Sequence, residues 1–372
     1  MGCRLKQKIL KITSWMPQRT NHEPNGVPLV RTSMQRPCVL LICLLMITTT
    51  LAGCIDDKGR IDGGGIVIDD GDDSGNQTNT NNSTTEEFVG SVIFETPGEA
   101  VHTGVSVPFI YYEDSIFYLY MCNGTEGHHY STSTDGLNYT SPQKTGIGGC
   151  GLNFVKLNDG TYRLYSTTKV TLENGTQSIN STSAVFTNLT DFAPTNRVDD
   201  DGTNAQSTGE PCNDFMGTPS VVRLNESDDS VRLYFSCSEP SHMAGFTSAT
   251  DGINFADSDG ILLNQAIDIE VHDIGDGYRV FYTLMNPDVH PELTPFHPQE
   301  IMTAVSDDGL NWVVEGMVAN VSTVAEGMGV EIDVLADPSA IQLDDGSWRI
   351  FFGSASEKTD DHGGIYSLRW TP

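Results

Sequence analysis

Basic residues are scarce in this chain of 372 residues. Lysines and arginines number 20 against 50 aspartates and glutamates, which gives a formal net charge of −30. Such a surface repels nucleic acid and does not attract anionic lipid headgroups, so neither is an expected partner. An acid-rich surface is also a simple means to solubility, and charge alone does not separate that explanation from a specific acidic function.

Two further patterns are missing. No Cys-x-x-Cys pair occurs among the cysteines of the folded region, which argues against zinc, and we predict neither a metal nor another cofactor. No window after the N-terminal region repeats apolar residues at helical spacing. Short runs of Val, Ile, Tyr, Phe and Thr instead alternate with clusters of Gly, Asp, Asn and Pro. The pattern predicts an all-β domain.

The first 87 residues are not expected to form a folded domain. The stretch MQRPCVLLICLLMITTTLAGC, Met34–Cys54, places an arginine, an apolar segment of signal-peptide length and small residues ahead of a cysteine. Residues 1–33 have no strand or helix pattern, and we interpret them as an extension from a start codon assigned too early. Residues 55–87 are rich in Gly, Asp, Asn, Ser and Thr, with too little apolar surface to become ordered, and are predicted to form an acidic tether.

The tetrapeptide LAGC, which ends at Cys54, resembles the lipobox of prokaryotic lipoproteins. The resemblance implies cleavage before Cys54 and attachment of lipid to that residue. The domain would then lie on the extracellular face of the cell membrane and meet the membrane only through its anchor. An ordinary transmembrane anchor that contains LAGC by chance is the alternative, and it also places the remaining chain outside the cytoplasm.

A turn phrase occurs three times. It reads STDGLNY at Ser133–Tyr139, ATDGINF at Ala249–Phe255 and SDDGLNW at Ser306–Trp312. An Asp-Gly pair is typical of a tight turn between strands, because Asp bonds its own backbone and Gly accepts positive φ. The aspartates are 116 and 57 positions apart, which predicts another copy near position 193, where TNLTDF, Thr187–Phe192, lacks the glycine.

A strand pair of the form apolar run, polar turn, apolar run occurs five times, at VPFIYYEDSIFYLY, LNFVKLNDGTYRLY, PSVVRLNESDDSVRLYF, IEVHDIGDGYRVFY and PSAIQLDDGSWRIFF. The ends of these pairs are on average about 58 residues apart, a period typical of propeller blades. The last unit ends at GGIYSLRW, one strand short, and FVGSVIF, Phe88–Phe94, is free to supply that strand. We therefore predict a monomeric five-bladed β-propeller over residues 88–372, with four-stranded antiparallel blades and a ring closed by the N-terminal strand.

Four cysteines lie in the predicted propeller, and an even number in an exported domain favours disulfides. Cys122 and Cys237 end equivalent second strands, while Cys150 and Cys212 precede first strands, so all four are expected at one end of the blades. We predict the pairs Cys122–Cys150 and Cys212–Cys237. The two other pairings remain open.

The five blades, the Ser-x-Asp-Gly-x-x-Trp turns and the Asp-Pro-Ser opening of DPSAIQLDDGSWRIFF together resemble the five-bladed β-propeller glycoside hydrolases, that is, arabinanases, xylosidases, invertases and levansucrases. The resemblance covers Phe88–Pro372. It implies a glycan site at the funnel on the axis, where the first strands begin. In that family, carboxylates from different blades serve there as nucleophile or base, as transition-state stabiliser and as general acid.

Glycoside cleavage needs two carboxyl groups, so acids at the blade entrances are the catalytic candidates. They are Glu210, Asp268, Glu270, Glu331 and Asp337. We assign the acid role to Glu210 and the base role to Asp337 or Glu331. The candidates for substrate binding are His102, Ser106, Asp214, His242 and Phe296.

Two entrances depart from the family pattern. Ser106 stands where the first blade of the family carries its catalytic Asp, and Gly151 replaces the acid of the second blade. The sequence therefore leaves two hypotheses open: a glycan-active enzyme with a rearranged site, and a surface module that binds a glycan or protein without cleaving it. Two of the candidate acids within about 10 Å across one funnel would favour the enzyme. A funnel lined by Ser106, Gly151 and Thr218 would favour binding.

A sialidase-type propeller fits less well. Its turns place the glycine one position later, and it needs an arginine triad, whereas the arginines here recur on second strands.

Overall fold

The computed structural model describes residues 87–147, 150–171, 177–192, 197–199, 204–206, 219–238, 241–248, 250–255, 259–284, 300–356 and 361–372. All of them belong to one compact unit, Gly71–Pro372. The predicted signal peptide, Cys54 and nearly all of the tether lie outside these residues. Within the described ranges, no helix is long and apolar enough to cross a membrane.

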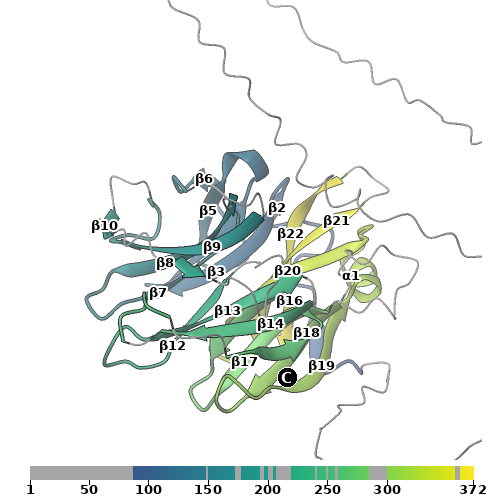
Figure 1. Ribbon diagram of the computed structural model, residues 1–372. Coiled ribbons are helices and arrows are strands. Elements are labelled where there is room, and N and C mark those ends of the chain that lie inside the picture. Colours follow the sequence, from purple (N-terminus) through teal and green to yellow (C-terminus); the bar gives the residue numbers. More distant parts are fainter. Residues whose placement is uncertain are drawn as a thin grey trace, which may run out of the picture. The chain divides into compact units, whose positions relative to one another are not determined.

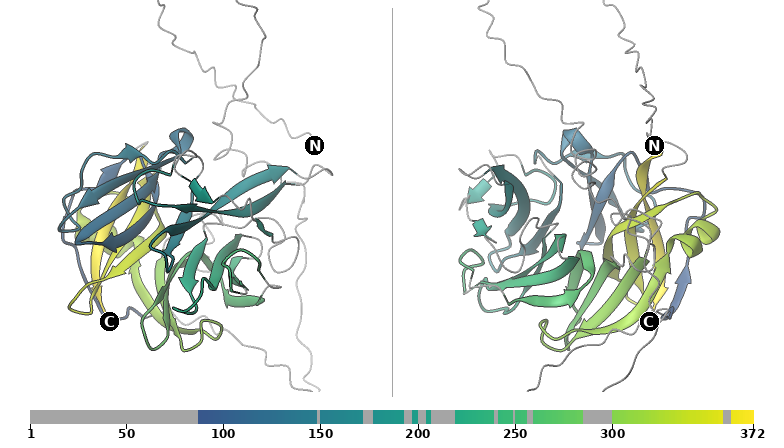
Figure 2. Two further views of the ribbon diagram at one scale, coloured as in Figure 1. Left: turned by 90° about the vertical axis from the view of Figure 1, so that its left-hand side faces the viewer. Right: turned by 45° about the vertical axis from the view of Figure 1, so that its right-hand side comes forward.

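Five antiparallel sheets stand in a ring and form a five-bladed β-propeller (Figures 1 and 2), as predicted. From the innermost strand outward, blade 1 contains β3 (Ser106–Glu113), β4 (Ile116–Cys122), β5 (His128–Ser133) and β6 (Gln143–Lys144). Blade 2 contains β7 (Leu152–Lys156), β8 (Tyr162–Thr171), β9 (Gln177–Phe186) and β10 (Arg197–Asp199), with β11 (Asn204–Gln206) also paired to β9.

Blade 3 contains β12 (Ser220–Arg223), β13 (Val231–Ser238), β14 (Ser241–Thr247) and β15 (Ile261–Asn264). Blade 4 contains β16 (Ala266–Asp273), β17 (Tyr278–Leu284), β18 (Glu300–Ser306) and β19 (Val313–Asn320). Blade 5 contains β20 (Val334–Gln342), β21 (Trp348–Ser356), β22 (Asp361–Thr371) and β1 (Ser91–Ile93), and β2 (His102–Thr103) also pairs with β22. We call the end of the axis where the inner strands begin the mouth, and the end where they finish the base.

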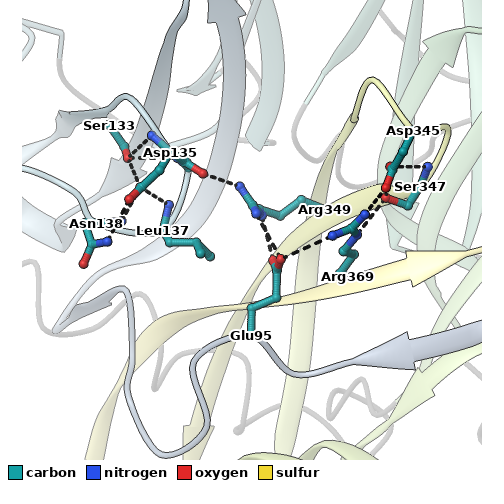
Figure 3. A network of polar contacts seen from close by, with 10 residues as sticks. Glu95, Ser133, Asp135, Leu137, Asn138, Asp345, Ser347, Arg349 and Arg369 are labelled. Atoms are coloured by element: carbon teal, nitrogen blue, oxygen red, sulfur yellow. Dashed lines mark hydrogen bonds and ion pairs between the residues drawn. The ribbon is translucent and has the colours of Figure 1, made fainter.

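The N-terminal strand closes the ring, as the sequence predicted. β1 pairs antiparallel with β22, from Ser91 opposite Thr371 to Ile93 opposite Arg369. Directly after β1, the Glu95 carboxylate receives hydrogen bonds of 2.8 and 3.1 Å from Arg349 on β21 (Figure 3). The first described residues and blade 5 are therefore joined by both backbone and side-chain bonds, and the outer edge of blade 5 is the short strand β1.

The repeated turn phrase attaches blades 1 to 4 to the blade that precedes each of them in the ring. In the copy at Ser306–Trp312, Oδ1 of Asp308 accepts the backbone N–H groups of the two residues after the glycine, so the turn is internally bonded. The outward-facing carbonyls then bind the preceding blade: Arg232 donates to the Asp308 carbonyl at 2.9 Å, and the Tyr234 hydroxyl donates to the Gly309 carbonyl at 3.1 Å.

The other copies dock in the same way. Arg349 of blade 5 donates to the Asp135 carbonyl at 2.8 Å (Figure 3), and the Tyr165 hydroxyl of blade 2 donates to the Gly252 carbonyl at 2.7 Å. The degraded copy works without its glycine, because Asn188 takes the place of the aspartate and the Tyr120 hydroxyl donates to the Leu189 carbonyl at 2.6 Å. The phrase recurs because it makes the same contact at four of the five junctions between neighbouring blades.

One helix departs from the sequence expectation. α1 (Val321–Met328) connects β19 to blade 5, in a segment for which no helical periodicity was recognised. It forms because Asn320 and Thr323 make a reciprocal capping box at its start and Gly329, at φ 69°, closes its end. Eight residues with two buried side chains give too few turns for a periodic pattern to stand out.

The hydrophobic core lies between the blades rather than in one central mass. One cluster joins Tyr234 and Met243 of blade 3 to Val271 and Tyr282 of blade 4. Packing between sheets explains why a single blade cannot be stable alone.

Cys122 and Cys150 are joined by a disulfide with a Cα–Cα distance of 5.2 Å, the pairing predicted for these two residues. Cys237 is also disulfide-bonded, but Cys212, its predicted partner, lies outside the described residues.

Candidate functional site at the propeller axis

The inner strands of three blades share a strained bulge at the mouth. Val107, Asp268 and Asp337 have φ values of 51°, 48° and 51°, and the pairing register shifts at each of these places. A non-glycine residue in this conformation costs about 1–3 kcal/mol, and such strain gathers at functional sites. Gly151 has φ 82° at the start of the inner strand of blade 2, where glycine removes the strain.

This geometry corrects the residue equivalence assumed from sequence. Val107 precedes Pro108 as Asp337 precedes Pro338, and both begin the bulge of their strand. Ser106 lies one position earlier and is exposed. Val107, and not Ser106, therefore occupies the blade 1 position that corresponds to Asp337, so blade 1 offers an apolar side chain where an acid was sought.

The bulges of blades 4 and 5 bring two acidic side chains together. Asp268 and Asp337 both line a small cavity of about 30 Å³ at the mouth, with walls formed by Val107, Pro108, Phe109, Leu152, Asn153, Pro219, Ile269, Glu270 and Pro338. The Asp268 carboxylate accepts a hydrogen bond from the backbone N–H of Asp337. A cavity of this size has room for a water molecule beside the two carboxyl groups.

Asp268 and Asp337 form a pair in which one proton is retained. Burial raises the pKa of Asp268 to about 6, although the hydrogen bond from the Asp337 N–H favours the ionised form. Burial and the charge of Asp268 raise the pKa of Asp337 well above its usual value. Because Asp268 receives the Asp337 N–H, which stabilises a carboxylate, Asp337 is the member that holds the proton.

The Asp337 carboxyl also lies over a glycine. A side chain at Gly353 on β21 would place its Cβ 3.6 Å from Oδ2 of Asp337. The bare backbone at this position leaves the space around the carboxyl open.

Glu270 is two residues beyond Asp268 and is only 5% exposed. Its Oε2 accepts the backbone N–H of Ala340 in blade 5 at 3.1 Å, and Ser339 also bonds it. Ser220 accepts the N–H of Val271 at 2.8 Å in the equivalent contact between blades 3 and 4. Glu270 thus joins two blades by accepting a backbone N–H, as Ser220 does. Burial raises its pKa to about 8, so it is a neutral acid at pH 7.

The remaining candidates do not join this cluster. His102 bonds the Ser131 hydroxyl at 2.8 Å and packs on Tyr139, His242 is fully buried on β14, and Glu331 is exposed after α1. None of these three lines the mouth cavity. Glu210, Asp214 and Phe296 lie outside the described residues, as does Thr218.

The sequence reading missed the wall that faces the two aspartates. Phe109, Leu152 and Asn153 line the cavity from blades 1 and 2. Asn153 occupies the repeat position that Ser220 has in blade 3 and Glu270 has in blade 4. It lies two residues after Gly151, as Glu270 lies two residues after Asp268, and this offset could have identified it from the sequence. Within the described residues, no cluster of three or more His, Cys, Asp or Glu side chains could hold a metal ion.

Comparison with solved structures supports the fold. The chain aligns with a thermostable family 43 glycoside hydrolase over 74% of this chain and 91% of the other, with a TM-score of 0.53 and 12% identity. It aligns with an endo-1,4-β-xylanase from Bacteroides thetaiotaomicron over 72% and 91%, with a TM-score of 0.50 and 14% identity. A family 43 protein from Bacillus licheniformis aligns over 74% and 54%, with a TM-score of 0.51 and 11% identity.

No family model and no curated protein matches the sequence. The protein is therefore a five-bladed β-propeller with the fold of the family 43 glycoside hydrolases. At such low identity, the likeness extends to the fold alone.

Proposed function

We propose that this protein is a glycan-active propeller on the cell surface, with its acid–base centre at Asp268 and Asp337. The observation that carries the proposal is the meeting of these two carboxyls, from neighbouring blades and on strained bulges, beside a space for water. Strained backbone and raised pKa values at a cavity are the marks of a catalytic site. The fold shared with family 43 glycoside hydrolases supports a glycan as the ligand.

The electrostatics suggest a role for each carboxyl. Asp337 retains the proton and would donate it to the leaving oxygen, whereas Asp268, ionised above about pH 6, would activate water or stabilise positive charge. This reverses the base role that the sequence suggested for Asp337. Hydrolysis would be fastest in mildly acidic solution and would decline as rising pH removed the shared proton.

A second candidate is a glycan receptor without catalysis. Glycosidases hold their two carboxyls about 5 to 9.5 Å apart on either side of the bond to be cleaved. Asp268 accepts a bond from the Asp337 backbone, so both acids lie on one side of the mouth, and the described residues opposite are Val107, Leu152 and Asn153. That asymmetry favours binding unless another acid reaches the mouth.

One experiment separates the two candidates. The purified full-length protein is incubated with plant, algal and microbial polysaccharides, and both the reducing ends released and the protein retained on each glycan are measured. The enzyme hypothesis predicts release that falls at least about a hundredfold in Asp337→Asn and Asp268→Asn, but not in Asp344→Asn, which alters an exposed acid of the β20–β21 turn. Retention without release establishes the receptor. If the protein neither releases reducing ends nor is retained on any glycan, both candidates are refuted.

Lipid on Cys54 is the proposed anchor, and it rests on the resemblance of LAGC to a lipobox. Labelling of cells with radioactive palmitate tests the anchor: we expect label in the wild type and none in Cys54→Ser, and equal labelling would rule out Cys54.

A further inference from the structure

One turn of the propeller contains an acceptor triplet for N-linked glycosylation. The triplet Asn-x-Ser/Thr is the pattern at which glycans are joined to exported proteins. In the degraded copy of the turn phrase, TNLTDF, Asn188 and Thr190 form this triplet. The intact copies have an aspartate at the first of these places and Leu or Ile at the other. The changes that degrade the copy therefore also create an acceptor.

Asn188 holds its turn with the side-chain oxygen alone. Its Oδ1 accepts the backbone N–H groups of Thr190 at 3.0 Å and of Asp191 at 2.8 Å. The residue is exposed, and its Nδ2 makes no hydrogen bond to the described residues. The atom that would be joined to a sugar is thus not committed to the fold.

The intact copies use an asparagine nitrogen differently. Each ends in an asparagine whose Nδ2 donates to the carboxylate of the turn aspartate, as Asn138 does to Asp135 at 2.8 Å (Figure 3). Asn138 also begins an acceptor triplet, Asn-Tyr-Thr, and is exposed. The same kind of turn therefore contains one acceptor with a committed nitrogen and another, Asn188, with an uncommitted one.

The other acceptor triplets with described asparagine side chains begin at Asn123, Asn225 and Asn320. Nδ2 of Asn225 donates to a carboxylate of its own turn at 3.2 Å. Asn320 is half-buried, and its side chain caps α1. Asn123 is half-buried and adjoins Cys122 of the disulfide. Among the acceptors with described side chains, Asn188 alone combines an exposed residue with a nitrogen that has no hydrogen-bond partner.

The turn that contains Asn188 lies at the base end of the propeller. β7 and β9 both pair antiparallel with β8, so β9 runs from mouth to base as β7 does, and the turn follows its last residue, Phe186. The Tyr120 hydroxyl of blade 1 donates to the Leu189 carbonyl at 2.6 Å, and the side chains of Leu189 and Phe192 are buried. The turn is thus fixed beside an exposed acceptor, and a glycan there would leave the mouth free.

We propose that Asn188 is a site of N-linked glycosylation and carries sugar in preference to the other acceptors with described side chains. The proposal rests on the export of the chain proposed above, and not on chemistry at the mouth. The donor is an oligosaccharide joined to a polyprenyl phosphate. In the transfer, Nδ2 forms a bond to C1 of the first sugar, the bond from C1 to the phosphate oxygen breaks, the lipid phosphate leaves, and Nδ2 loses a proton to the transferring enzyme. The two turn bonds remain, because they use Oδ1.

Peptide mapping of the full-length protein, produced in its source organism, tests the proposal. Chymotrypsin cuts after Phe186 and Phe192, which releases the peptide 187–192, with Asn188 as its only acceptor. We expect tandem mass spectrometry to find saccharide on this peptide. Its occupancy should be higher than that of the peptides that contain Asn138 or Asn225.

Variants of the triplet then assign the sugar to the asparagine. Asn188→Asp restores the residue of the intact copies, so it can accept both turn N–H groups but has no amide nitrogen, and the sugar on this peptide should be lost. Thr190→Val should also lose it. Thr190→Ser, the matched control, keeps the hydroxyl of the triplet and should keep the sugar. Thermal unfolding checks that each variant is folded.

Three results would overturn the proposal. They are a wild-type peptide 187–192 without sugar, sugar that remains on this peptide in Asn188→Asp, and an occupancy at Asn138 or Asn225 that equals or exceeds that at Asn188. Absence of sugar from a protein that still carries lipid on Cys54 would refute the glycan site alone. Conversely, sugar on Asn188 in a protein that neither cleaves nor binds any polysaccharide would refute the proposed function alone.

Discussion

Glu270 should make the stability of the propeller depend on pH in the alkaline direction. Burial raises its pKa from 4.5 to about 8 in the folded protein, whereas the unfolded chain ionises near the usual value. Between these two pH values the folded state binds the additional proton, so folding stability falls as pH rises. The full shift corresponds to about 5 kcal/mol, of which about 4 kcal/mol is lost between pH 5 and pH 9.

Glu270→Gln isolates this effect. A glutamine can still accept the Ala340 N–H but cannot ionise, so the variant should lack the alkaline loss due to this group. The assay is urea unfolding of both proteins at several pH values from 5 to 9. We expect the stability difference, variant minus wild type, to rise by up to about 4 kcal/mol over that range.

Asp268 and Asp337 contribute equally to both proteins, so the difference between them reports Glu270. Glu331→Gln, which alters an exposed glutamate after α1, is the matched control and should follow the wild-type profile. Parallel profiles for wild type and Glu270→Gln would refute the reasoning. They would show that Glu270 is ionised in the folded state or that water reaches it, and its structural role as a neutral acid would have to be abandoned.

Three further predictions concern the contacts between and within blades. Gly309→Ala should destabilise the protein by about 1–3 kcal/mol more than Gly346→Ala in thermal unfolding. Both glycines have positive φ, but only at Gly309 would the added Cβ meet the preceding blade, 2.5 Å from the Tyr234 hydroxyl. Equal losses of stability in the two variants would mean that the turn does not dock as described. Arg349→Met removes the Arg349–Glu95 ion pair of Figure 3 and should cost about 3–5 kcal/mol, because the poorly exposed Glu95 carboxylate keeps only the 4.0 Å contact with Arg369. A loss below about 1 kcal/mol in urea unfolding would show that water replaces the arginine. Replacement of both Cys122 and Cys150 by serine should lower the unfolding free energy by about 3–4 kcal/mol, given a separation of 28 residues, and an unchanged urea midpoint would exclude a stabilising role for the disulfide.

Local signals made the architecture predictable. Asp308 closes its turn with bonds to residues two and three positions away, so the phrase can be recognised wherever it occurs. The strand pairs alternate with polar turns at a regular period, and a blade left one strand short implies its missing partner. Even the degraded copy at Asn188 was located by spacing, since the repeat is imposed by the same contact between blades each time.

Only the tertiary structure decided the site. Asp268 and Asp337 are 69 positions apart, and the ring brings them into contact at the mouth, where burial and mutual repulsion change their proton affinities. The one-residue shift from Ser106 to Val107 depends on a bulge that only strand pairing creates. Turns and strand alternation depend on neighbouring residues, so the sequence shows them directly. Backbone strain, burial and shared protons arise from groups that are distant in sequence, and these three features determine the chemistry of the site.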